Sequence, residues 1–203
     1  MPGYIESLLA RLHHKPPKKP VDAPNQWRKP TYGRTQQLSV PQDSSPRLTP
    51  AAAVLLQSTV GSLLFYSRAV DPSMLPGLNE ISTQQSDPTI NTQKKVLYLL
   101  DYVATHSNAT IRYHASEMCL HVDSDAAYLV LPKARSRLAG HYFLSDLPTK
   151  SSPVRSNGPI LTECKTIRTR SNLTNTTQSS TMSSAARACY CVDSTARAVN
   201  VSR

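Results

Sequence analysis

The spacing of apolar residues changes once along this chain, near residue 110, and that change constrains the fold class most. Before it, Val96, Leu99, Leu100 and Val103 recur at helical intervals. After it, apolar and polar residues alternate, as in "MCLHVDSDAAYL" at 118–129, and a period of two is typical of strands. A run of helices followed by a run of strands predicts an α+β protein.

Composition divides the chain into four segments. Residues 1–50 contain nine prolines, which exclude regular helix or central strand. There we expect a short amphipathic helix near 3–13 and then an extended basic linker. Residues 51–108 are predicted to be helical and residues 109–168 to form a sheet. Residues 169–203 are mostly Ser, Thr, Asn, Gln and Ala, and we expect a disordered tail because few of them can build a core.

Three helices are predicted between residues 51 and 106. The first, 51–68, carries six polar residues, so we interpret it as a buried helix of a soluble protein rather than a membrane span of ~20 apolar residues. The other two begin at Asp-Pro pairs, with Asp71 and Asp87 as caps and the prolines in the first turn. Pro76 is expected to kink the second helix or delay its start.

The strand-like part predicts a hairpin and two further strands. The hairpin joins Ile111–His114 to Met118–Ser124, and the later strands cover 134–146 and 158–167. Alternation places Met118, Leu120 and Val122 on one face. Cys119, His121, Asp123 and Asp125 then share the other face.

Charge and cysteine usage narrow the range of partners. The net charge is +10 with a pI near 9.7, which favours polyanions and above all nucleic acid. The four cysteines and six histidines do not complete a zinc spacing. Glycosylation sequons occur without a secretory signal, so we expect an intracellular protein, cytoplasmic or nuclear, with no membrane or small-molecule partner.

The residues expected to contact phosphates are Lys15, Lys18, Lys19, Arg28, Lys29, Arg34, Lys133, Arg135 and Arg137. The alternative is a solvated basic linker.

Asp123 and Asp125 are the candidate chemical groups. Two carboxylates on one face at a strand end suit magnesium, which prefers oxygen ligands. Hydrolysis of a phosphodiester by two metals about 4 Å apart needs three or four carboxylates from different elements. From this stretch alone, acids that end the strand at the solvent are the better interpretation.

Several short motifs follow one another in order along the chain. They are Val60-Gly61-Ser62-Leu63, Asp71-Pro72, Asp87-Pro88-Thr89, Leu97 to Tyr102, Asp123-Ser124-Asp125-Ala126, Arg135-Ser136 and Gly140-His141-Tyr142. In this order they resemble the copia-type retrotransposon polyprotein where reverse transcriptase joins RNase H. The resemblance covers roughly residues 1–170, and the opening "MPGYIESLLARLHH" is similar to the end of a reverse transcriptase.

The resemblance implies a fold, a cofactor and one site residue. It implies helices of the reverse transcriptase thumb or connection, followed by a partial, truncated RNase H-like mixed sheet. Asp125 matches the aspartate that binds magnesium on the first strand, with Asp123 as a helper. Ala186-Arg187-Ala188-Cys189 stands where a glutamate-bearing helix is expected, and later aspartates have no counterpart up to Arg203.

We therefore expect a catalytically inactive fragment, which would aggregate or stay partly unfolded with its sheet uncovered. One alternative is a module that binds an RNA–DNA hybrid or duplex without chemistry. Another is a residual metal-dependent RNase H, completed by an unrecognised acid such as Asp193.

Overall fold

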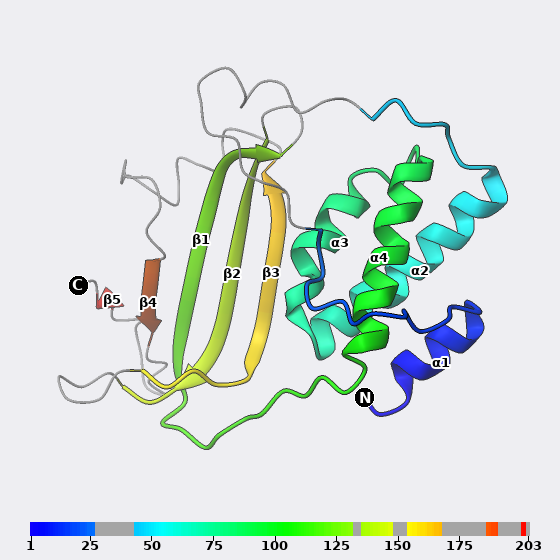
Figure 1. Cartoon of the computed structure of the whole chain (residues 1–203). Coiled ribbons are helices and arrows are strands. Elements are labelled where there is room, and N and C mark those ends of the chain that lie inside the picture. Colours follow the sequence, from blue (N-terminus) through cyan, green and yellow to red (C-terminus); the bar gives the residue numbers. More distant parts are fainter. Residues whose placement is uncertain (27–42, 132–134, 148–153, 168–185, 191–199, 202–203) are drawn as a thin grey trace. The chain divides into compact units, whose positions relative to one another are not determined.

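The computed structural model describes residues 1–26, 43–131, 135–147, 154–167, 186–190 and 200–201 (Figure 1). The chain divides near Thr110 into a helical unit and a strand unit. The α+β prediction is confirmed, with the two kinds of element following one another along the sequence.

The helical unit contains α1 (Tyr4–Arg11), α2 (Pro50–Ala69), the 3-10 helix η1 (Pro72–Met74), α3 (Leu75–Ser82) and α4 (Ile90–Thr105). Figure 1 shows these helices gathered into one bundle. Its core is built from apolar side chains at helical spacing, including Ile5, Leu8, Val60, Leu63, Leu78, Leu99 and Val103. The short helix predicted near 3–13 is therefore confirmed as α1, and Val96, Leu99, Leu100 and Val103 form a buried face of α4.

The two Asp-Pro pairs have different outcomes. Asp71 caps η1 as predicted, because its carboxylate accepts the Ser73 N–H at 3.1 Å, and α3 starts only at Leu75. The prediction for Asp87 is wrong. The cap of α4 is Thr89, which accepts the N–H of Thr92 and forms a capping box with it. Asp87 instead forms an ion pair with the Arg47 guanidinium at 2.9 Å.

Helix α2 is buried on one side only. Leu56, Val60 and Leu63 lie in the core, whereas Val54 and Phe65 are exposed. By length and composition it is the one helix in the described part of the chain that could span a membrane. The core helix of a soluble protein passes the same test.

The strand unit is an antiparallel sheet. Strands β1 (Cys119–Leu131), β2 (Arg135–Ser145) and β3 (Pro159–Ile167) pair in succession, which confirms the predicted strands at 134–146 and 158–167. The shorter strands β4 (Ala186–Tyr190) and β5 (Asn200–Val201) continue the sheet beyond β1, in the order β3-β2-β1-β4-β5.

Three expectations about the sheet need correction. The expected mixed sheet is not found, since every described pairing is antiparallel. The hairpin between 111–114 and 118–124 is wrong: residues 111–118 form no strand, Met118 has a positive φ of 61°, and β1 pairs with β2 instead. Within 169–203, residues 186–190 and 200–201 form strands, while the rest of that segment lies outside the described residues.

Candidate functional site

Asp123 and Asp125 lie within β1, between β2 and β4. On β2, Asp123 stands opposite His141 and Asp125 opposite Ala139. On β4, Asp123 stands opposite Arg187. Asp125 is exposed, and its Oδ1 accepts the N–H of Ala126 at 2.8 Å. The strand therefore brings the two acids to one face, as predicted from the alternation.

The face that carries the acids changes from core to surface along β1. Cys119 and His121 are buried, Asp123 is half-buried and Asp125 is exposed. The His121 ring stacks on Phe143 with centroids 5.4 Å apart, and its Nε2 lies 2.9 Å from the backbone oxygen of Asp146. His121 is therefore a packed, buried side chain of the sheet, and the two acids lie where this face reaches solvent.

The described carboxylates do not fit a two-metal site. Among the residues that the structure describes, no group of three or more His, Cys, Asp or Glu could hold a metal ion. Asp146 accepts the N–H of Glu117 at 2.9 Å, and Glu163 pairs with Lys165 at 2.8 Å. Asp193 lies outside the described residues. Two acids on one strand cannot supply the converging carboxylates that two-metal hydrolysis needs.

The segment matched to a glutamate-bearing helix is a strand. Residues 186–189 belong to β4, which runs antiparallel to β1. Its position opposite Asp123 is held by Arg187, a residue type that carries no ligand for a cation. The expectation of a helix at this point is therefore corrected.

The candidate phosphate contacts fall on both units. Lys15, Lys18 and Lys19 are exposed in the helical unit. Their segment is held against α4 by the hydrogen bond between His14 Nε2 and Asp101 Oδ1 at 2.8 Å. Arg137 lies on β2 in the strand unit and is half-buried. Arg28, Lys29, Arg34 and Lys133 lie outside the described residues, and only the backbone of Arg135 is described.

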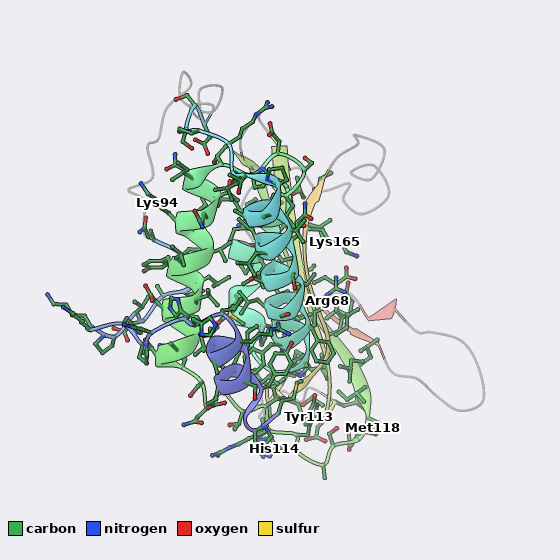
Figure 2. All side chains as sticks on the ribbon, turned by 90° about the vertical axis from the view of Figure 1, so that its right-hand side faces the viewer. Arg68, Lys94, Tyr113, His114, Met118 and Lys165 are labelled. Atoms are coloured by element: carbon green, nitrogen blue, oxygen red, sulfur yellow. The ribbon has the colours of Figure 1, made fainter. Side chains whose placement is uncertain are left out.

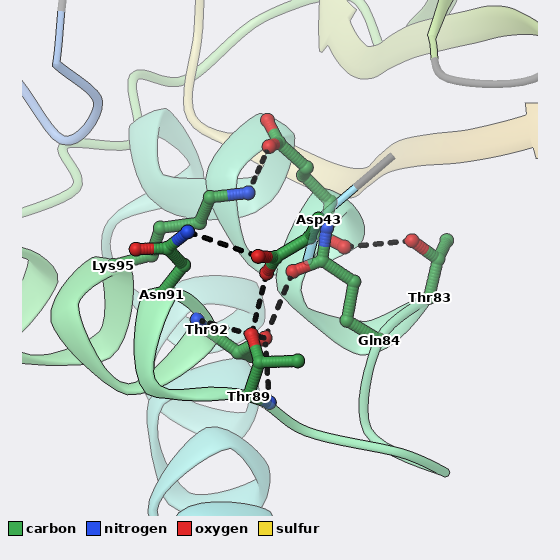
Figure 3. A network of polar contacts seen from close by, with 8 residues as sticks. Asp43, Thr83, Gln84, Thr89, Asn91, Thr92 and Lys95 are labelled. Atoms are coloured by element: carbon green, nitrogen blue, oxygen red, sulfur yellow. Dashed lines mark hydrogen bonds and ion pairs between the residues drawn. The ribbon is translucent and has the colours of Figure 1, made fainter. Parts of the chain in front are cut away.

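A polar junction at the start of α4 was not predicted from the sequence (Figure 3). The Asp43 carboxylate accepts hydrogen bonds from the hydroxyl of Thr89, from the backbone N–H and hydroxyl of Ser45, and from the Asn91 amide. These bonds hold the pKa of Asp43 well below its usual range. The Leu48 N–H donates to the Pro88 carbonyl at 2.9 Å beside it. The junction joins two segments more than 40 residues apart.

The only sequence signal for this junction is local. In "DSS" at 43–45, an aspartate that bonds the residue two positions later is typical of an Asx turn. That pattern does not indicate that Thr89 and Asn91 complete the cluster.

Comparison of the chain with protein-family models, with curated proteins and with solved structures gives no match. The functional assignment therefore depends on the residues and on their geometry.

Proposed function

We propose that the chain is a retroelement-derived fragment of a reverse transcriptase and RNase H that does not hydrolyse its nucleic acid. The order of the matching motifs supports this proposal. In the Val60–Leu63 motif of α2, Val60 and Leu63 are buried. The two Asp-Pro motifs lie at the start of η1 and just before α4. The acidic motif falls within β1, and Gly140-His141-Tyr142 falls within β2.

The proposal that the fragment is inactive rests on the residues around Asp125. Its neighbour in β2 is Ala139, and the next acid on its own strand is Asp123, which faces His141 and Arg187 in register. An RNase H-like site would need further carboxylates converging on Asp125 from other elements. The described residues supply no such group around it.

The test is cleavage of a labelled RNA–DNA hybrid by the full-length chain in magnesium and then in manganese. We expect no product above that of an Asp125→Asn control prepared in parallel. Metal-dependent cleavage that disappears in Asp125→Asn would overturn the proposal, because a further acid would then complete the site. Cleavage that persists equally in Asp125→Asn would indicate a contaminating nuclease.

A nucleic-acid-binding module is the second candidate, supported by the three exposed lysines at 15, 18 and 19. If they contact phosphates, log K for a hybrid should fall steeply with log salt concentration, and each lost contact should reduce the slope by about 0.9. The variant Lys15→Gln/Lys18→Gln/Lys19→Gln should therefore bind with a shallower slope. Lys94→Gln is the matched control, since Lys94 is exposed on α4, away from that segment (Figure 2). Equal slopes for both variants would exclude this lysine cluster as the binding surface.

A further inference from the structure

Strand β3 is an edge strand. The sheet order begins with β3, and among the described strands it pairs with β2 alone. Ile160 is 57% and Leu161 46% exposed. An edge strand presents backbone N–H and C=O groups that can pair with another chain, and proteins commonly block such edges with proline, bulges or a covering loop.

Among the residues that the structure describes, the features that block the edge of β3 lie at its beginning. Pro159 lacks a backbone donor, and the pairing with β2 is irregular between Tyr142 and Phe143. The Tyr113 hydroxyl donates to the Pro159 carbonyl at 3.0 Å, so the segment before β1 contacts the strand there. Figure 2 shows Tyr113 near one end of the strand unit and Lys165 well away from it. None of these features reaches residues 161–167.

Residues 161–167, "LTECKTI", are complementary to themselves in the antiparallel direction. Two copies paired about Cys164 place Leu161 opposite Ile167 of the other copy, and threonine opposite threonine. The same register places Glu163 opposite Lys165, twice by symmetry. Apolar pairs, threonine pairs and opposite charges are the cross-strand pairs that stabilise sheets.

We propose that β3 is the docking surface for a second copy of this chain, paired antiparallel about a two-fold axis at Cys164. The interface is isologous, so it closes as a dimer and does not propagate into a fibre. It is strand addition to a sheet edge, in which backbone hydrogen bonds supply affinity and side-chain pairs fix the register.

The charged pairs already have the required placement. In one copy, Glu163 and Lys165 are two residues apart on one face, with Lys165 Nζ 2.8 Å from Glu163 Oε1. Dimer formation exchanges this contact in each of the two copies for the two contacts across the axis. A single seven-residue pairing is a small interface, so association should be weak and dependent on concentration.

Disulfide cross-linking of Cys164 can test the proposed register between the two β3 strands. Directly opposed residues of an antiparallel pair have Cα atoms about 4.5 or 5.5 Å apart, and a disulfide needs roughly 4.4–6.8 Å. Burial raises the pKa of the Cys164 thiol, with Arg137 acting in the opposite direction. Little thiolate is therefore present at neutral pH, and rapid cross-linking requires the two thiols to be held together.

The cross-linking experiment uses the full-length chain with diamide. Two thiols form one S–S bond, and their two electrons and two protons reduce the diamide N=N bond to a hydrazine. We expect a disulfide-linked dimer whose linked peptide joins Cys164 to Cys164, and no dimer from Cys164→Ser. Cys119→Ser is the matched control, since Cys119 is buried on β1, and it should cross-link as the parent chain does. A linked peptide between other cysteines, with no Cys164 pair, would refute the register.

The decisive experiment exchanges the charges and measures association by sedimentation equilibrium. Glu163→Lys alone and Lys165→Glu alone each place like charges opposite one another twice, and each should weaken dimerisation about tenfold or more. An equimolar mixture of these two variants should form the dimer again, because each then supplies the charge that the other lacks. The double variant Glu163→Lys/Lys165→Glu should also recover the parent affinity.

Recovery in the mixture would show that both single variants fold. A parent chain that stays monomeric at several hundred micromolar would refute the proposal. So would single variants that associate as tightly as the parent, a mixture without recovery, or open-ended aggregation in place of a dimer. The inference concerns association alone and does not depend on the proposed function.

Discussion

Replacing Thr89 with alanine should destabilise the helical unit more than the loss of an ordinary helix cap. The Thr89 hydroxyl accepts the N–H of Thr92 at 3.3 Å, lies 3.1 Å from the Thr92 hydroxyl, and donates to Asp43. Thr89 is only 9% exposed. An N-cap contributes about 1 kcal/mol, and the buried hydrogen bond between the hydroxyls of Thr89 and Thr92 about 1 kcal/mol more. The free energy of unfolding should therefore fall by about 2 kcal/mol.

The assay is urea unfolding followed by the far-ultraviolet circular dichroism of the helices. Thr49→Ala is the matched control: Thr49 caps α2, but it is exposed and its bond to the Ala52 N–H is long, at 3.4 Å. That variant should lose about 0.5 kcal/mol. Thr89→Ser retains the hydroxyl and should be close to the parent. The reasoning is refuted if Thr89→Ala costs no more than Thr49→Ala, or if serine at this position costs as much as alanine.

Three further expectations concern the helical unit, and each is measured by denaturant unfolding. The pKa of Asp43 is held low by its hydrogen bonds. The stability that this carboxylate contributes is therefore present above about pH 4 and lost as the pH falls further. In Asp43→Asn the free energy of unfolding should depend less on pH in this range. Burial raises the pKa of Tyr102, so stability should fall as the pH rises through about 10 and beyond, less steeply in Tyr102→Phe. Leu63 is fully buried, and Leu63→Ala should cost about 2–5 kcal/mol; Phe65→Ala, at an exposed position of the same helix, should change stability by about 0.5 kcal/mol or less.

The helices could be predicted from the sequence because their cores depend on local periodicity. Val96, Leu99 and Val103 recur on one face of α4, and that face is buried. The cap of α4 could not be predicted in the same way. The Asp-Pro pattern suggested Asp87, but Thr89 follows it and is bonded by Asp43 from a distant segment. A local sequence signal cannot decide whether Asp87 or Thr89 is the cap when the contact that decides it comes from Asp43, a residue far away in the sequence.

The strands show the corresponding limit of alternation. A period of two indicates a strand and the face of each residue, but it does not identify the neighbouring strand. The predicted hairpin used the nearest alternating segment. In the structure Met118 has a positive φ and ends any extension toward residue 111, and β1 pairs with the longer partner β2.

The candidate site was predictable in its geometry but not in its surroundings. Asp123 and Asp125 share a face as expected, together with Cys119 and His121. No local pattern indicates that His121 is fully buried against Phe143, because a histidine beside acids also fits a polar site. Packing against other strands decides which end of such a face is core, and this information lies outside the stretch itself.

The position of each strand in the sheet also separates the two proposals experimentally. Asp125 lies on β1, flanked by β2 and β4, whereas Glu163 and Lys165 lie on the edge strand β3 with β2 between them. Glu163→Lys and Lys165→Glu should each change the affinity of the dimer. Neither should change the result of the RNA–DNA hybrid cleavage assay, because β3 is not adjacent to β1. Asp125→Asn should leave the dimer affinity unchanged for the same reason. If either substitution altered both readouts, the most economical explanation would be a changed fold of the whole sheet, and neither site could then be assigned from that variant.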